Sequence, residues 1–285
     1  MKKALILGIA CFFTQSLFAQ KTIKFSVKYL PMQNYATTFK MDMDVNMNID
    51  DTVRAQKIKA SGQPSSMLIK MNMATVLNIA TQAQDAKKDV PFTMTYNDVV
   101  VSGSMNGQAL PIPVPDLKSL AFKGHYSNQT KKIGIEGLQG GTLDDAKKAA
   151  AEGQLLQIFN QYSFPDTTLK IGDTFEQTLP LSIPTAAGNS DVITQVKFTL
   201  KEVKGNEAIF DMSQTADAKV NIPQANGEMV FKGTGGGTMV YDISAKFPVR
   251  SSINMNFSYK MNVGGASMSG DMKGVSVTEV KVTKK

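Results

Sequence analysis

Hydrophobic and polar residues alternate without exception from Met41 to Asp50, in the segment MDMDVNMNID. Methionine, valine or isoleucine occupies every odd position, and aspartate or asparagine occupies every even one. Side chains on a β-strand point to opposite faces with a period of two residues. The segment is therefore predicted to be a strand with one face in an apolar interior and the other face in water.

The same alternation recurs along most of the chain. It is present in residues 22–29, 67–79, 92–96, 192–200 and 253–263. Short turns that contain glycine, at 106–108, 204–206 and 264–265, separate alternating runs, as expected of β-hairpins. One-sided strands of this kind favour antiparallel sheet with one solvated face. We therefore expect a mainly β fold built on a large, curved, half-barrel-like antiparallel sheet.

One segment, residues 142–163, has helical spacing instead. Thr142 is suited to cap a helix, two aspartates follow in the first turn, and Pro165 comes two residues after the end of the segment. Its apolar residues, among them Leu156 and Phe159, recur at intervals typical of one helix face. The prediction is one principal helix, at about 142–163, with the sheet wrapped around it.

The first 19 residues have the three-part pattern of a secretory signal peptide. Lys2 and Lys3 precede an apolar run over residues 4–13, and Leu17 and Ala19 occupy the −3 and −1 positions of a cleavage site. The apolar run is too short to cross a bilayer as a helix. The pattern predicts export, to the periplasm, the outer membrane or the extracellular space.

Cleavage after residue 19 would leave residues 20–285, which we expect to form a single β-rich domain. An alternative is lipoprotein processing at Cys11, although Gly8 is a poor residue at the position where that recognition sequence needs a large apolar side chain. The two routes differ in whether the exported protein is acylated.

Composition excludes several kinds of chemistry from the exported chain. Cys11 is the only cysteine, so residues 20–285 can form no disulfide, thiolate metal site or cysteine nucleophile. The full chain has 31 basic and 24 acidic residues, with the lysines scattered along it. Scattered charge is typical of a solvated surface, so no nucleic-acid partner is expected. No second long apolar run follows the leader, so the protein is not expected to be an integral membrane protein with helical spans.

Two kinds of metal site fit part of the methionine and aspartate pattern. A calcium loop that begins at Asp42 would need a glycine at its sixth position and an acid at its twelfth, which hold Met47 and Val53. The Met-x-Met pairs at 41–43 and 71–73 could supply sulfur to copper, but no histidine or cysteine accompanies them. We therefore expect no metal or other cofactor. The 17 methionines are better explained as an apolar surface that adapts to groups of varied shape.

No arrangement typical of a catalytic site is visible in the sequence. His125 is the only histidine, and the Gly-x-Ser-x-Gly sequence of many serine hydrolases is absent. The glycine-rich segment 232–239 lacks the lysine and hydroxyl residue that follow the glycines of a phosphate-binding loop. Carboxylates can still converge from distant strands, so an enzyme is the least favoured hypothesis.

A structural turn is expected in the segment FPDTTLKIGDTFEQTLPL, residues 164–181. Pro165 ends the helix, Gly172 permits the turn, Asp173 can hydrogen-bond its own backbone, and Phe175 is expected in the core. The segment resembles a family of secreted Gram-negative bacterial proteins of unknown function, in which tryptophan often replaces the phenylalanine. The resemblance extends over most of the exported chain and implies no activity. The implied layout is similar to the half-barrels of lipoprotein carriers, which hold acyl chains against a concave sheet.

Three functional hypotheses follow from these patterns. The first is an envelope protein that binds an apolar ligand or lipid on a concave, methionine-rich sheet. The second is a protein–protein interaction module that docks on another envelope protein, and the third is an enzyme with no recognisable motif. The first hypothesis places the ligand among side chains of the strands and the helix: Met41, Met43, Met71, Met73, Leu156, Phe159, Met255 and Phe257.

Overall fold

The computed structural model describes residues 22–62, 64–112, 117–118, 120–140, 164–185, 188–222, 227–263 and 265–285. The first half of this chain contains β1 (Ile23–Phe25), β2 (Gln33–Ile49), α1 (Thr52–Ala60), β3 (Ser66–Thr81), β4 (Val90–Met105), β5 (Gln108–Leu110), β6 (Ala121–Tyr126) and β7 (Ile133–Gln139). The second half contains β8 (Thr167–Leu169), β9 (Thr174–Thr185), β10 (Gly188–Lys204), β11 (Glu207–Ile222), β12 (Gly227–Asp242), β13 (Phe247–Val263) and β14 (Ala266–Lys284). The prediction of a mainly β protein is confirmed.

Twelve of the strands form one antiparallel sheet. Their order is β7-β6-β4-β3-β2-β14-β13-β12-β11-β10-β9, with the short β5 paired to β4. Neighbours in the sheet follow one another along the chain, apart from β4 and β6, between which β5 intervenes, and the central pair, in which β2 lies beside β14. The sheet therefore consists of two series of consecutive strands that are joined along one line at its middle.

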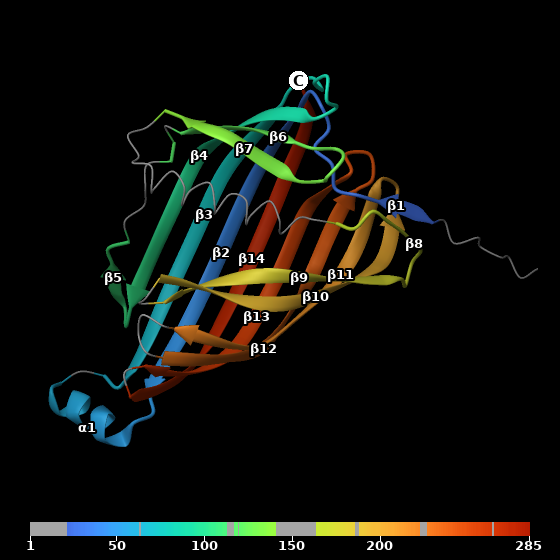
Figure 1. Ribbon diagram of the computed structural model, residues 1–285. Coiled ribbons are helices and arrows are strands. Elements are labelled where there is room, and N and C mark those ends of the chain that lie inside the picture. Colours follow the sequence, from blue (N-terminus) through green and yellow to red (C-terminus); the bar gives the residue numbers. More distant parts are fainter. Residues whose placement is uncertain are drawn as a thin grey trace, which may run out of the picture.

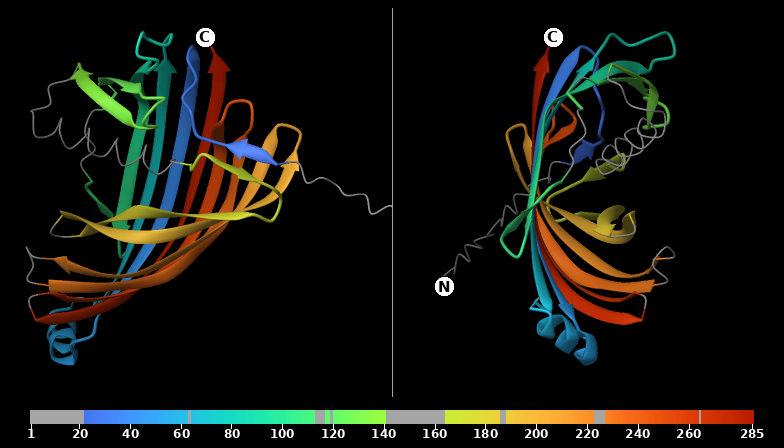
Figure 2. Two further views of the ribbon diagram at one scale, coloured as in Figure 1. Left: turned by 45° about the vertical axis from the view of Figure 1, so that its right-hand side comes forward. Right: turned by 90° about the vertical axis from the view of Figure 1, so that its left-hand side faces the viewer.

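The sheet is strongly bent. Figure 2 shows β6 and β7 folding over at one end and the strands from β9 onward curling round at the other, so that the two ends enclose a concave side. The two-stranded sheet formed by β1 and β8 lies on this concave side (Figure 1). The large curved antiparallel sheet expected from the alternation is therefore present.

The concave face carries the hydrophobic core. Phe25 of β1 packs edge-on against Phe210 of β11 and Tyr241 of β12, with ring centroids 5.1 and 5.2 Å apart. A second cluster lies around Tyr35 and Phe122, between β2, β3, β4 and β6. A third, which contains many methionines, lies between β2, β12, β13 and β14. Aromatic pairs with this tilted geometry add to the stabilisation gained from burial.

The hairpin turns have the backbone conformations that their sequences favour. Asn106 and Gly107 have φ angles of 51° and 83°, and Gly205 and Gly265 have φ angles of 57° and 74°. Asparagine and glycine adopt positive φ at a lower cost than other residues. These turns therefore fix the register of the strands on either side.

The turn before β9 has a built-in set of hydrogen bonds. Gly172 has a φ of 94°, and the carboxylate of Asp173 accepts a hydrogen bond from the Lys170 N–H at 3.0 Å. Phe175 then stacks on Phe198 of β10, with ring centroids 4.7 Å apart. Each of these residues has a structural explanation.

The helical parts of the chain differ from expectation. The principal helix predicted at 142–163 and the leader at 1–19 lie outside the described residues. The helix that is described, α1, was not predicted. Asp51 caps it by accepting hydrogen bonds from the N–H groups of Val53 and Arg54, both at 3.0 Å. None of its residues is buried, and Figure 1 shows it projecting beyond the ends of β2 and β3. Within the described ranges, no helix has the length and apolar character to cross a membrane.

Candidate functional site

The register of β2 and β3 places four of the predicted ligand-site residues together. Met41 is paired with Met73, and Met43 is paired with Met71. Directly opposed residues in an antiparallel pair point to the same face of the sheet. The four methionines therefore form one continuous patch across the two strands.

The same face continues across β14 to β13. Gly274 of β14 lies opposite Met43 on one side and Met255 on the other. Phe257 follows two residues after Met255 and so points to the same side. Gly274 has no side chain of its own, and the methyl group of Met255 reaches over it, since a Cβ atom there would lie 3.3 Å from Met255 Cε.

This face is the concave one. From Met255 the row of opposed residues continues through Gly235 and Gln214 to Val196. Val196 belongs to the core cluster that includes Phe25 of β1, the strand on the concave side. The methionines that the alternation predicted to point inward therefore line the inside of the bend.

We refer to the inward-pointing side chains of this region as the methionine face. They share the concave side of β2, β3, β12, β13 and β14, as the strand registers show. The members are Met41, Met43, Val45, Met47, Met67, Met71, Met73, Met229, Phe231, Met255, Phe257, Tyr259, Met261, Met268 and Met272.

Burial divides the predicted ligand-site residues into two groups. Met43 and Phe257 are buried, at 8% and 1% exposure. Met41, Met71, Met73 and Met255 are half-buried and so have part of their surface open. Leu156 and Phe159, predicted to contribute from the helix, lie outside the described residues. The structure thus brings six of the eight predicted side chains onto one apolar face.

Four members of the methionine face did not follow from the sequence: Met229, Phe231, Met268 and Met272. Met268 and Met272 occupy alternate positions in β14, but serine and glycine residues interrupt the apolar pattern there. Met272 reaches the face because it is paired with Val45 on one side and Phe257 on the other. The pairing of distant strands was the missing information.

Glycines make room for the large side chains of β13. Gly233 of β12 is opposite Phe257, and Gly270 of β14 is opposite Tyr259. A Cβ atom at Gly233 would lie 2.5 Å from Cδ1 of Phe257, and one at Gly270 would lie 2.7 Å from the Tyr259 hydroxyl. The aromatic rings therefore lie over the backbone of the neighbouring strands.

Charged side chains of β2 are confined to the opposite face. Asp42 accepts a hydrogen bond from the Asn72 amide at 2.6 Å, and Asp44 lies 3.8 Å from the Lys70 ammonium group. The described ranges contain no group of three or more histidine, cysteine or acidic residues that could hold a metal ion. The methionine face is thus chemically suited to contact apolar groups.

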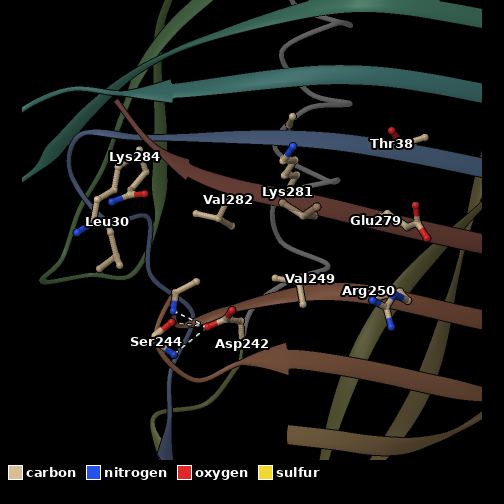
Figure 3. A pocket seen from close by; sticks show the side chains of 14 residues that line it. Leu30, Thr38, Asp242, Ser244, Val249, Arg250, Glu279, Lys281, Val282 and Lys284 are labelled. Carbon is tan, nitrogen blue, oxygen red and sulfur yellow. Dashed lines mark hydrogen bonds between the residues drawn. The ribbon is translucent and has the colours of Figure 1, made fainter. Parts of the chain in front are cut away.

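A groove opens elsewhere in the sheet, where β13 and β14 separate. Their pairing stops at Arg250 and Glu279, while β14 stays paired with β2 as far as Lys284. The groove between them has a volume of about 960 Å³ (Figure 3). Val249 and Val282 point into it from the two strands. Inward and outward side chains both line the groove, because the sheet is split at this place.

Asp242 lies at one end of this groove. Burial raises the pKa of its carboxyl group, but hydrogen bonds from the N–H groups of Ala245 and Ser244, the Ser244 hydroxyl and the Asn206 amide outweigh burial and hold the pKa below its ordinary value. These donors all belong to the turns beside the groove. Asp242 therefore stabilises the connection between β12 and β13.

A smaller hollow, of about 480 Å³, lies over β2, β13 and β14. Its lining includes the outward-pointing residues Asp42, Asp44, Asn254 and Asn256. Met43, Met255 and Gly274 of the inward-pointing row line it as well. The hollow therefore lies along the row that runs from Met43 through Gly274 to Met255.

Comparisons with known proteins give no family. No family model and no curated protein matches the chain. A solved structure described as "Lipid-protein interactions in lipovitellin" has 9% identity and a TM-score of 0.46 to this chain, over 90% of this chain and 26% of the other. The enduracididine biosynthesis enzyme MppR, solved with a condensation product of pyruvate and imidazole 4-carboxaldehyde, has 8% identity and a TM-score of 0.11, over 90% and 91% of the two chains. The chain therefore spans about a quarter of the lipovitellin structure, and similarity at this level carries no functional argument.

Proposed function

We propose that the protein is an exported envelope protein that holds the apolar part of a lipid or similar ligand on the methionine face. The observation that carries this proposal is the partial exposure of inward-pointing methionines, among them Met71, Met73 and Met255, on the concave side of the sheet. Apolar surface in contact with water costs about 25 cal/mol per Å². A bound apolar molecule would remove that surface from water.

Methionine suits this role for a physical reason. Its side chain is unbranched, with three rotatable bonds and a polarizable sulfur, so it fits apolar groups of different shapes. A surface built from many such side chains can repack around more than one ligand. The proposal therefore gives the protein a binding role and not a catalytic one, with an apolar molecule and not nucleic acid as its partner. Export is proposed on the leader pattern of residues 1–19.

Binding of a fluorescent apolar probe tests this proposal. N-phenyl-1-naphthylamine is expected to bind the wild-type protein with micromolar affinity. Met255→Glu should weaken binding at least tenfold, because a carboxylate on the apolar face must be desolvated when the probe binds. Asn254→Glu is the matched control, since residue 254 is exposed on the opposite face. Its affinity should stay within twofold of wild type.

Two results would overturn the proposal. One is wild-type binding no tighter than to an unrelated β protein of similar size. The other is equal affinity in the Met255 and Asn254 variants, which would place the probe elsewhere. Circular dichroism of each variant shows whether the sheet is intact.

A second candidate, the interaction module, has one observation in its favour. β7 and β9 are the end strands of the sheet, and each pairs with a single neighbour within it. An unpaired strand edge can accept a strand from another protein. If the apolar probe fails to bind, cross-linking in the cell envelope through a photoreactive residue on β7 would test this candidate.

A further inference from the structure

Two buried polar side chains interrupt the apolar concave face. Gln214 of β11 is 8% exposed, and Thr194 of β10 is fully buried. Gln214 belongs to the row that runs through Gly235 to Met255, at the border of the methionine face. Buried polar groups in proteins are nearly always hydrogen-bonded. A polar atom of this pair that has no partner therefore indicates where a ligand could supply one.

The threonine hydroxyl determines how the glutamine amide is turned. The Thr194 hydroxyl donates to the Leu179 carbonyl oxygen at 3.0 Å, so its proton is already in use. It can therefore only accept from Gln214, and the Gln214 Nε2 donates to it at 3.0 Å. The amide nitrogen thus faces β10, and the amide oxygen must face the other way.

The oxygen of Gln214 is the group without a partner. Among the described residues, no donor lies within hydrogen-bonding distance of this buried Oε1. A Cβ atom added to Gly235 would lie 3.0 Å from it. The oxygen therefore lies over the glycine of β12, on the side from which Met255 continues the row.

We propose that Gln214 Oε1 is the polar anchor of the ligand site and accepts a hydrogen bond from a hydroxyl or amide N–H group of the ligand. The apolar body of the ligand then lies across Gly235, Met255 and Gly274 toward Met43. Strands are about 4.8 Å apart, so the four steps from β11 to β2 give the body a path of about 19 Å. Neither glycine adds a side chain to this path, and the flexible Met255 side chain, whose Cε would lie 3.3 Å from a Cβ atom at Gly274, can move aside for a ligand.

This inference rests on the proposed function and adds the chemical class of the ligand. A carboxylate has acceptors only and cannot satisfy an amide oxygen. The preferred ligand is therefore a neutral lipid with a hydrogen-bond donor at one end, and an ionised fatty acid is disfavoured. The site discriminates through an unpaired buried acceptor, which penalises ligands that leave it unpaired.

The test compares 1-decanol with its methyl ether as competitors of N-phenyl-1-naphthylamine. The two have nearly the same apolar body, but only the alcohol can donate a hydrogen bond. Wild-type protein should bind the alcohol about tenfold more tightly, which corresponds to about 1.4 kcal/mol. Gln214→Met, which keeps the volume and removes the acceptor, should lower that ratio to about one without changing affinity for the ether by more than about twofold. Thr215→Val, an exposed residue on the opposite face, should keep the wild-type ratio.

The outcomes separate this inference from the proposed function. Equal binding of alcohol and ether by wild type overturns the anchor and leaves the apolar site standing. A preference that persists in Gln214→Met also overturns it, because the acceptor would then lie elsewhere. Failure of both competitors and of the probe overturns the proposed function together with the anchor.

Discussion

Gly236 and Gly237 are neighbours in β12 but face opposite sides of the sheet. A Cβ atom at Gly237 would lie 1.8 Å from the carbonyl oxygen of Ser252 in β13, whereas one at Gly236 would have its nearest contact at 3.4 Å, with the carbonyl of Met212. Backbone atoms cannot move aside as a flexible side chain can. One glycine is therefore required by the close approach of β13, and its neighbour is not.

This difference predicts the effects of two alanine substitutions. Gly237→Ala should lower the free energy of unfolding by about 1–3 kcal/mol, because the added methyl group forces the strands apart. Gly236→Ala should be close to neutral or stabilising by up to about 1 kcal/mol, since it restricts the unfolded chain without a clash. Thermal unfolding followed by circular dichroism compares the two. Equal melting temperatures would show that β12 and β13 are less tightly apposed than described.

At the scale of elements, period-two alternation predicted the long strands and the face that each buries. β2 follows the pattern over its whole second half, with Met43 buried and Asp44 exposed. The alternation did not predict α1, because that helix has no buried residue and its sequence signal is limited to the cap at Asp51. Alternation arises only where one face of an element is buried, so it cannot predict an element that has no buried face.

The candidate site was predicted only in part, because alternation shows which face a residue occupies but not which strands are paired. Alternation placed Met41 and Met255 on inward faces, but the pairing of β14 with β2 is a long-range contact that no local pattern contains. Met272 was therefore missed. Gln214 did leave a signal, since it is a polar residue at an apolar position of the series Phe210, Met212, Gln214 and Ala216.

The register of β2 predicts unequal effects for two aspartate substitutions. Met43→Asp should lower the free energy of unfolding by about 3 kcal/mol or more, since it leaves a cavity and buries a carboxylate without a partner. Asn48→Asp should change it by less than about 0.5 kcal/mol, because Asn48 is exposed on the convex side between Ser66 and Ser269. Urea unfolding midpoints measure both. Similar midpoints would mean that β2 is turned the other way.

At the scale of the whole molecule, buried tyrosines make the stability of the fold depend on pH. Burial raises the pKa of Tyr35, Tyr96, Tyr126, Tyr241 and Tyr259 to about 12. An unfolded chain has tyrosine pKa values of about 10. The unfolded state therefore loses protons at lower pH than the folded state, and the stability linked to these groups is complete below about pH 10.

Stability should consequently fall as pH rises from about 10 to about 12. The five phenols should ionise together as the sheet unfolds, because each is held neutral by the fold. The chain has no tryptophan, so phenolate absorbance near 295 nm can be followed beside the circular dichroism of the sheet without interference. A smooth titration of all tyrosines near pH 10, with the sheet still intact, would contradict the burial described.

The joining of β2 and β14 at the middle of the sheet has a consequence for how the protein is made. Their paired residues are separated by 219 positions, between Ile49 and Met268, up to 251 positions, between Gln33 and Lys284. A chain that emerges from its N-terminus cannot complete the sheet until residues 266–284 have arrived. Until then β2 keeps an unpaired edge, which can capture another chain. Arrival of the last strand therefore covers this edge and joins the two halves of the sheet.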